Sequence, residues 1–278
     1  MGIDQNALKF LVAARAHGVD FSRTLMIGRQ RLYVPPHLAP ASLRDCLTTG
    51  GEPYAEDLFR ALGAGAVTSL DRSPYEGASI LHDLGTPLPP AMRGRHSLVF
   101  DAGTLEHVFN APQALKNCME LVTPGGHLIL CTGTNNFCGH GFYQFSPELF
   151  HRALSAEHGF SVVRMIACDA RPESDWYAVR DPQAAGRRIE IVGPYQVMLM
   201  VLAKRVADVE PFRDMPQQSD YERAWDGDAH PDHGSPAPAP VRRGVRRFIP
   251  QGLADAIVRR RSAAQYPAHS FERVSNSA

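Results

Sequence analysis

The chain has 278 residues, 44% of them hydrophobic, and its 29 Lys and Arg residues balance 29 Asp and Glu residues. A chain of this length can bury a large core without metal or disulfide staples, and zero net charge excludes a surface built as a whole to bind nucleic acid or anionic lipid. Five cysteines without a C-x-x-C pair support neither a disulfide framework nor a zinc ribbon.

The first half of the chain alternates short apolar runs with helical patterns. Asp4 is placed to cap a helix that ends near Gly18, and Pro35, Pro36 and Pro40 forbid a continuous helix after the first strand. Two short helices are expected at 41–47 and 54–62. Strands are expected at 24–27, 66–70, 80–83 and 97–100.

The second half continues the alternation. A helix is expected at 105–121, a turn at Pro124-Gly125-Gly126, and a helix that Ser146 caps and Pro147 opens. Further strands are expected at 127–131, 160–166 and 196–204. Continuous apolar strands between helices predict an α/β fold with a doubly wound, Rossmann-like sheet, whose ligands bind at the carboxyl ends of the strands.

The composition changes near Asp208. Residues 208–240 hold eight acidic residues and many prolines, which predicts a mobile acidic linker after a domain at 1–207. Residues 241–278 begin with seven arginines between Val241 and Arg261, and Leu253 to Arg261 is expected to form a short helix that docks on a surface. The surface is that of its own domain, a second subunit or an anionic membrane.

Three motifs then point to a family. Asp101 ends the fourth strand, Leu105-Glu106-His107-Val108 opens the next helix, and Pro124-Gly125-Gly126 leads to the fifth strand. In this combination the chain, from about Phe21 to Val206, resembles the class I S-adenosylmethionine-dependent methyltransferases. The resemblance implies a seven-stranded sheet with an antiparallel last strand, and S-adenosylmethionine as cofactor.

The resemblance also implies roles for residues at the strand ends. Asp71 would accept hydrogen bonds from the ribose hydroxyls, with a helix N-cap as the alternative, and Asp83 would accept from the adenine amino group, with a turn as the alternative. Asp101 and Gly103 would line the methionine end. His107 is a cofactor-binding candidate, although it and Glu106 equally suit the first turn of a helix.

The first loop departs from the family pattern. The family's glycine-rich loop opens directly into a helix, whereas this chain reads LMIGRQRLYVPP, in which only Gly28 matches. Arg29 is a candidate to bind the methionine carboxylate in place of the missing amides. The alternatives are a structural salt bridge for Arg29 and a degenerate member of the family without turnover.

His140 is the candidate general base, because it follows the fifth strand and has the side chain whose ordinary pKa suits a base near neutrality. A histidine that only bonds loop backbone is the alternative. Asn136, Tyr143 and Gln144 are candidates to bind a polar acceptor. No metal is expected, because neither the cysteines nor the histidines show ligand spacing.

The sequence therefore predicts a methyltransferase of the O-methylating type, acting on a small-molecule or a sugar- or lipid-linked hydroxyl. The alternatives are a methyltransferase-like binding or scaffold protein without turnover, and a membrane contact through the arginine-rich tail; nucleic acid is not an expected partner. A cytoplasmic location is expected, because no signal pattern opens the chain and its longest apolar run, 197–203, is too short to span a bilayer.

Overall fold

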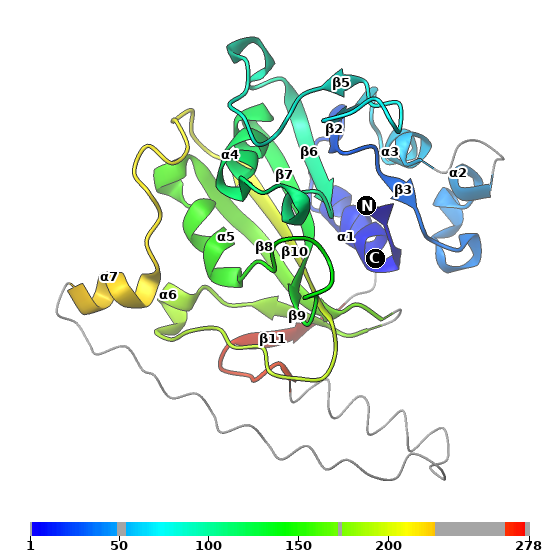
Figure 1. The fold of residues 1–278 in the computed structure, drawn as a ribbon. Coiled ribbons are helices and arrows are strands. Elements are labelled where there is room, and N and C mark those ends of the chain that lie inside the picture. The colour runs from blue at the N-terminus through cyan, green and yellow to red at the C-terminus, as the bar shows by residue number, and fades with distance from the viewer. Residues whose placement is uncertain (1, 49–53, 172–173, 226–264, 276–278) are drawn as a thin grey trace, which may run out of the picture.

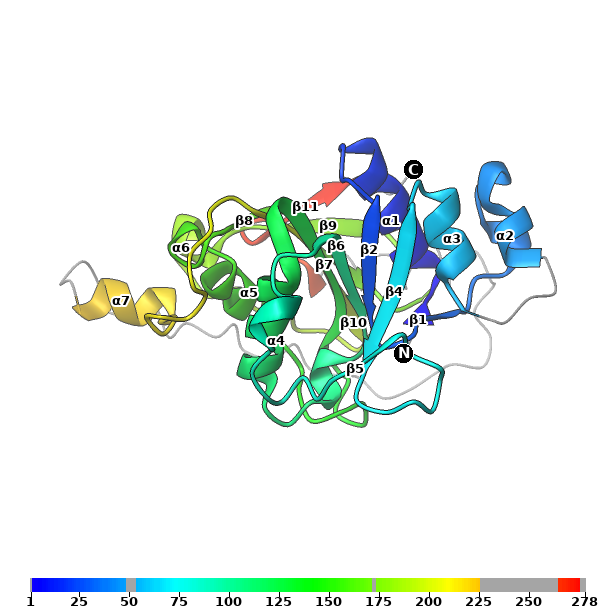
Figure 2. The same cartoon turned by 90° about the horizontal axis from the view of Figure 1, so that it is seen from above.

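A computed structural model describes residues 2–48, 54–171, 174–225 and 265–275. Within these residues a single mixed sheet of nine strands runs through the molecule, with helices on both of its faces (Figures 1 and 2). Its strands are β2 (Arg23–Ile27), β4 (Ala66–Asp71), β5 (Ile80–Leu81), β6 (His96–Ala102), β7 (Val122–Asn135), β8 (Phe160–Asp169), β9 (Trp176–Val179), β10 (Val197–Arg205) and β11 (Phe271–Val274).

The strand order across this sheet is β11-β9-β8-β10-β7-β6-β2-β4-β5. The strands from β5 to β7 are parallel to one another, whereas β10 runs antiparallel between β7 and β8. The seven strands from β5 to β8 are thus the expected doubly wound sheet with an antiparallel last strand. This confirms the predicted fold class.

Alternate residues of the central strands face opposite helical layers. Leu25 and Ile27 of β2 pack in the cluster that contains α4 (Ala111–Leu121) and α5 (Pro147–Ala153). Met26 packs in the cluster that contains α1 (Gln5–Ala16) and α3 (Glu56–Ala61). Both faces of the sheet are buried, which is why these strands read as continuous apolar runs.

The structure contains the hydrogen bonds predicted to cap two of the helices. Asp4 caps α1 by accepting the Ala7 N–H at 2.8 Å, and Ser146 caps α5 by accepting the Leu149 N–H at 3.3 Å. The expected helix at 105–121 is instead divided. A short 3₁₀ turn, η4 (Leu105–His107), precedes α4, because Pro112 has no N–H to donate and its ring restricts it to the first turn of a helix.

The remaining described elements are short. Strands β1 (Gly2–Ile3) and β3 (Arg31–Leu32) form a separate parallel pair. The helices are η1 (Pro36–Leu38), η2 (Ala41–Leu43), α2 (Asp45–Thr48), η3 (Pro90–Met92), η5 (Ala156–His158), α6 (Pro182–Ala185) and α7 (Ser219–Trp225). Among the described residues, no helix is long and apolar enough to cross a membrane.

The chain after residue 207 differs from the expected linker and tail. Residues 208–225 are placed against the domain and include α7, because their acidic side chains pair with its basic ones: Asp220 with Arg188 at 2.6 Å, and Glu210 with Lys116 at 2.8 Å. The acidic composition of this stretch does not show that its side chains have basic partners elsewhere in the chain. The rest of the predicted linker, 226–240, lies outside the described residues.

The last strand corrects the predicted boundary of the tail. Strand β11 pairs with β9 in the main sheet, and the side chains of Tyr266 and Phe271 are buried in its core. The segment from residue 265 is therefore part of the domain, because its aromatic side chains contribute apolar surface to the same core. The predicted helix at 253–261 lies outside the described residues.

Candidate active site at the carboxyl ends of the strands

The carboxyl ends of β2, β4, β5 and β6 meet at one edge of the sheet. A pocket of about 700 Å³ lies there, and both Asp71 and Asp83 line it. Thr104, His107 and Asn110 also line it. The structure thus brings the predicted ribose and adenine residues, which are separated by the whole of β5, to a single pocket.

Each of these two carboxylates is held by a turn. Asp71 accepts the Ser73 N–H at 3.2 Å, and Asp83 accepts the Gly85 N–H at 2.9 Å through Oδ1. The Oδ2 atom of Asp83 lies 3.5 Å from Nε of Arg72. The turn bond of Asp83 is the structural alternative foreseen for that residue, whereas no helix follows Asp71 for it to cap. Both turn bonds coexist with a position on the pocket wall, where they orient the carboxylates.

Gly28 occupies the position expected of the family's first glycine. Its φ is +68°, a left-handed conformation that favours glycine, and its N–H donates to the Leu70 carbonyl at 2.7 Å. The chain then enters β3, and no helix begins directly after this loop, so no helix dipole acts on it.

The guanidinium of Arg29 is engaged with other groups of the protein. Its Nε lies 2.7 Å from Oε1 of Glu56, its Nη1 donates to the Glu76 carbonyl at 2.9 Å, and its guanidinium stacks 4.0 Å from the centre of the Tyr54 ring. The structural salt bridge is therefore the arrangement found. The role predicted for Arg29, binding the methionine carboxylate, is not the one its contacts favour, because Glu56 occupies the guanidinium.

Asp101 also differs from its predicted role. It is fully buried and accepts the N–H groups of Thr104 at 3.0 Å and Leu105 at 3.2 Å, so it caps the turn after β6 and does not line either pocket of the site. Burial, and then the nearby charge of Glu106, raise the pKa of Asp101 to about 7. Gly103, with φ +92°, lines a second and smaller pocket.

This smaller pocket, of about 280 Å³, lies between the end of β6 and the start of α1. Gly103, Glu106 and His140 line it together with Asp4, Tyr33 and Met198. One turn of chain separates the two pockets, since Thr104 and His107 face the larger one and Gly103 and Glu106 the smaller. A ligand spanning both pockets would therefore pass directly over the 103–107 turn.

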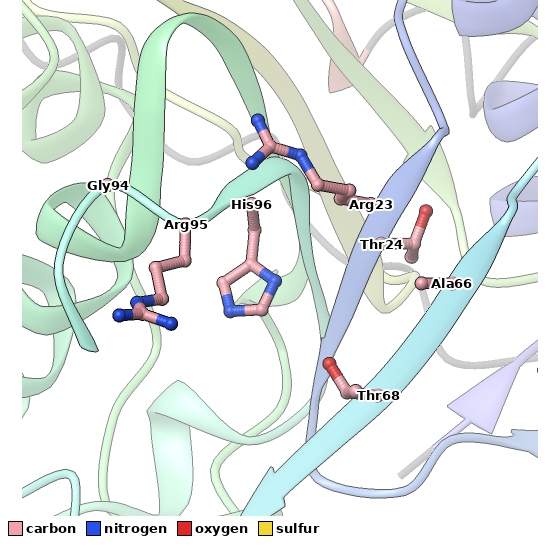
Figure 3. A pocket seen from close by; sticks show the side chains of 7 residues that line it. All are labelled: Arg23, Thr24, Ala66, Thr68, Gly94, Arg95 and His96. Atoms are coloured by element: carbon pink, nitrogen blue, oxygen red, sulfur yellow. The ribbon is translucent and has the colours of Figure 1, made fainter. Parts of the chain in front are cut away.

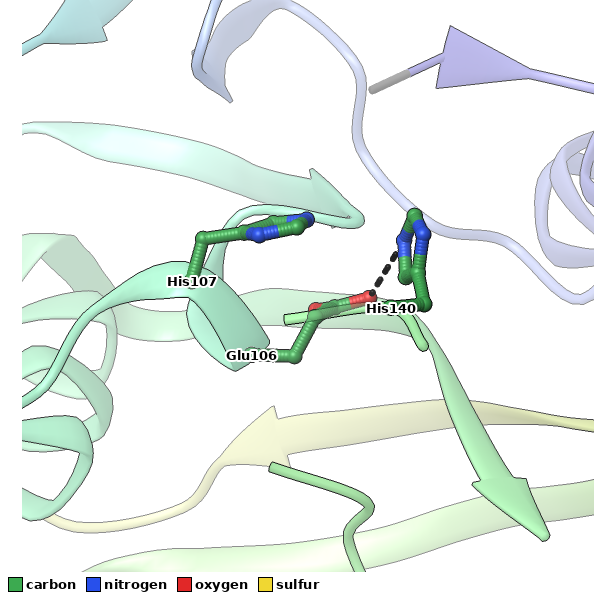
Figure 4. A group of neighbouring side chains, drawn as sticks. All are labelled: Glu106, His107 and His140. Carbon is green, nitrogen blue, oxygen red and sulfur yellow. Dashed lines mark ion pairs between the residues drawn. The ribbon is translucent and has the colours of Figure 1, made fainter. Parts of the chain in front are cut away.

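Glu106, His107 and His140 form a cluster on that turn (Figure 4). Nε2 of His140 lies 3.7 Å from Oε1 of Glu106, and the two imidazole rings meet edge to face with centroids 4.9 Å apart. Glu106 is 2% exposed, whereas both histidines are exposed. Desolvation lowers the pKa of His107, which favours its neutral form.

Sequence reasoning treated Glu106 as a first-turn residue and found no metal-ligand spacing. In the structure a loop that returns from the end of β7 brings His140 to Glu106 and His107. No local spacing encodes that contact. The Leu-Glu-His-Val motif was the only signal available for Glu106 and His107.

The three predicted acceptor-binding residues hold the His140 loop in place. Asn136 donates to the carbonyls of Gly193 at 2.8 Å and Tyr195 at 2.7 Å. The Tyr143 hydroxyl donates to the Phe109 carbonyl at 2.7 Å, and Gln144 accepts the Phe137 N–H at 2.7 Å. Their polar groups are engaged with protein, so the prediction that they bind an acceptor is not what their contacts favour.

A third pocket, of about 500 Å³, lies at the opposite edge of the sheet, where β2, β4 and β6 begin (Figure 3). Arg23, Arg95 and His96 line it. Burial, and then the charges of the two arginines, lower the pKa of His96 to about 4. Ligands of doubly wound sheets bind at the carboxyl edge, so this pocket is not the candidate active site.

Comparisons with known proteins leave the reaction open. No family model matches the chain, and no curated protein matches it. Among solved structures, the N-methyltransferase NodS from Bradyrhizobium japonicum WM9, in complex with S-adenosyl-L-homocysteine, is 13% identical with a TM-score of 0.41, over 72% of this chain and 86% of that chain.

Two further solved structures have names that denote other reactions. The [4+2]-cyclase SpnF is 13% identical, with a TM-score of 0.42, over 72% of this chain and 80% of that chain. The branched-chain polyamine synthase from Thermus thermophilus is 15% identical, with a TM-score of 0.38, over 77% of this chain and 61% of that chain. At this distance the reaction has to be argued from the site itself.

Proposed function

We propose that this protein binds S-adenosylmethionine at the carboxyl edge of its sheet and transfers the methyl group to an acceptor hydroxyl. The observation that carries the proposal is that Asp71 and Asp83, at the ends of successive strands, line one pocket of about 700 Å³. The acceptor is a small molecule or a sugar- or lipid-linked hydroxyl. The Leu-Glu-His-Val and Pro-Gly-Gly motifs support the same proposal.

The adenosine half of the cofactor fits the residues present. The carboxylate of Asp71 is acceptor-only and suits the two ribose hydroxyls, and that of Asp83 suits the adenine amino group. The turn bonds to Ser73 and Gly85 hold both carboxylates in place before the ligand arrives. When bound, the cofactor supplies a sulfonium-activated methyl group, so the protein's own task is alignment and removal of a proton.

His140 with Glu106 is the group proposed for the proton. The imidazole lines the smaller pocket, and the carboxylate 3.7 Å away stabilises the imidazolium that forms when the ring takes a proton. The Phe142 N–H donates to the Glu106 carbonyl at 2.7 Å, which ties the His140 loop to the turn between the two pockets. A hydroxyl in the smaller pocket would then face both the base and the cofactor.

Cofactor binding is tested by calorimetry with S-adenosylmethionine and with S-adenosylhomocysteine. Asp71→Ala removes charge-assisted hydrogen bonds of about 1.5–3 kcal/mol, so we expect affinity to fall by roughly 10- to 100-fold. Asp57→Ala is the matched control, because Asp57 is an exposed aspartate that pairs with Arg60 on α3, away from both pockets. Equal affinities in the two variants would remove Asp71 from the site.

A scaffold protein without turnover is the second candidate. It is favoured by two observations on the first loop: β3 follows it in place of a helix, and Arg29 pairs with Glu56. Mass spectrometry of S-adenosylmethionine incubated with the protein and hydroxylated acceptors separates the two. Any acceptor that yields its methylated product together with S-adenosylhomocysteine excludes the scaffold function.

A further inference from the structure

We propose that Glu106, His107 and His140 form a binding site for one divalent transition-metal ion, of the zinc, cobalt or nickel type. One potential ligand atom of each side chain lies within 4.8 Å of the other two. Two imidazoles and one carboxylate are a donor set that such ions bind, with further coordination positions left for water or substrate. Metal binding itself does not rest on the proposed methyl transfer.

The carboxylate of Glu106 is an independent reason to place a cation here. The residue is 2% exposed, and its Oε2 accepts no hydrogen bond from the residues that the structure describes. An ionised carboxylate buried without a full set of partners is costly, and a bound cation satisfies it. Asp101, fully buried near the end of β6, accepts the N–H groups of Thr104 and Leu105 and so places a second acidic group next to this turn.

The backbone around the cluster is built for this close approach. The Glu106 carbonyl accepts the N–H groups of Phe142 at 2.7 Å and Tyr143 at 3.3 Å, so the loop that carries His140 is bonded directly to the turn that carries the other two ligands. A Cβ atom at Gly141 would lie 2.7 Å from that carbonyl oxygen, and the φ of Gly141 is +79°. Only glycine permits the loop to come this near.

Small side-chain rotations are enough to form the site. Ligand atoms bound to one ion at about 2.1 Å lie about 3.4 Å apart in a tetrahedron, against a limit of 4.8 Å in the unliganded cluster. The Glu106 side chain is buried, whereas those of His107 and His140 are exposed, and we expect the two rings to rotate toward the carboxylate when an ion binds. Figure 4 shows both rings on the same side of the Glu106 carboxylate.

The position of the cluster gives the ion a use, which does rest on the proposed function. His107 lines the larger pocket, and Glu106 and His140 line the smaller one, so an ion between them would stand where the two pockets meet. A bound cation lowers the pKa of a coordinated hydroxyl and orients it. With the ion present, His140 would be a ligand, and the ion would take over the task of preparing the acceptor hydroxyl.

The experiment measures metal binding without cofactor or acceptor. The full chain, freed of metal with a chelator, is titrated with Co²⁺ while visible absorption is recorded, and Zn²⁺ affinity is read by competition with a chromophoric chelator. We expect one ion per chain. We expect Zn²⁺ affinity to fall by at least about 10-fold in each of three variants, Glu106→Gln, His107→Ala and His140→Ala. Removing a residue that only hydrogen-bonds to a metal ligand already lowers metal affinity by about 10-fold or more, and loss of a ligand itself should cost at least as much.

Two control variants are matched to these. His37→Ala removes an exposed histidine on η1 outside the cluster, and Cys138→Ser removes the exposed thiol nearest to it in sequence. Both should bind like the parent chain. His107→Ala keeps the test decisive if Glu106→Gln does not fold, because the His107 side chain is exposed.

Three results would overturn the proposal: no binding at micromolar Zn²⁺, binding that survives all three ligand variants, or binding lost only in Cys138→Ser. Because Co²⁺ binding is read without S-adenosylmethionine, a failure of the metal site and a failure of the proposed function are distinguishable. A chain that binds S-adenosylmethionine but no Co²⁺ would leave the methyltransferase proposal in place and remove the ion.

Discussion

Phe271→Ala is expected to destabilise the whole domain, although residue 271 belongs to the segment 241–278 that the sequence analysis placed outside the domain. The Phe271 side chain is 2% exposed and meets the Tyr266 ring edge to face at 5.3 Å. Tyr266 in turn stacks on Tyr177 of β9 with centroids 4.1 Å apart, and its hydroxyl donates to Asp169 at 2.9 Å. Truncating Phe271 removes the ring that closes this stack.

The size of the effect follows from burial. Replacing a fully buried Phe by Ala costs about 3–5 kcal/mol, through lost apolar burial and the cavity left behind. For a domain of this size each kcal/mol lowers the melting temperature by about 2–4 °C, so a fall of roughly 6–20 °C is expected. Set against a typical unfolding free energy of about 5–15 kcal/mol, this is a large share of the stability.

Thermal melting of the full chain, followed by circular dichroism, measures this directly. Glu272→Ala is the matched control, since residue 272 lies on the same strand and pairs with Ala178, but its side chain is exposed. Its effect should stay within about 0.5 kcal/mol, as for most surface substitutions. If the two variants melt together, β11 is not part of the core and the reasoning is refuted.

Three further outcomes are expected. His140→Ala should lower turnover by about 10²–10⁴ while S-adenosylmethionine affinity, read by calorimetry, stays near that of the parent chain; undiminished turnover would exclude the role. Burial, and then Arg23 and Arg95, lower the pKa of His96 to about 4, whereas it is about 6.5 in the unfolded chain. The neutral His96 therefore makes its full contribution to the free energy of unfolding above about pH 6.5. This contribution is lost as the pH falls toward 4, by about 2 kcal/mol after allowance for solvent screening. Urea unfolding of His96→Asn should lack this loss, and an identical pH profile in parent and variant would contradict the assignment. A thiol reagent should modify the exposed Cys138 in the native chain. Burial raises the pKa values of three other thiols and keeps them unreactive until the chain unfolds, namely those of Cys118, Cys131 and Cys168. Mass spectrometric mapping of the modified cysteines measures both outcomes.

Local patterns in the sequence were enough to predict the core of the fold. Continuous apolar runs such as 97–100, capped helices such as the one after Asp4, and the motifs at 105–108 and 124–126 depend on neighbours within a few residues. They therefore placed the seven central strands and the edge at which Asp71 and Asp83 lie. The apolar period at 105–121 does not show where α4 begins, because Pro112 is restricted to the first turn of a helix and the helix starts at Ala111.

Contacts between distant segments decided the rest. The pairing of β11 with β9, the burial of Asp101 beneath its turn, and the ion pair of Arg29 with Glu56 each depend on a partner that no spacing reveals. The same holds for the cluster at the 106–107 turn, where His140 comes from a loop 34 residues later in the chain. A charged or polar side chain takes its role from whichever partner burial places beside it, and only the tertiary structure supplies that partner.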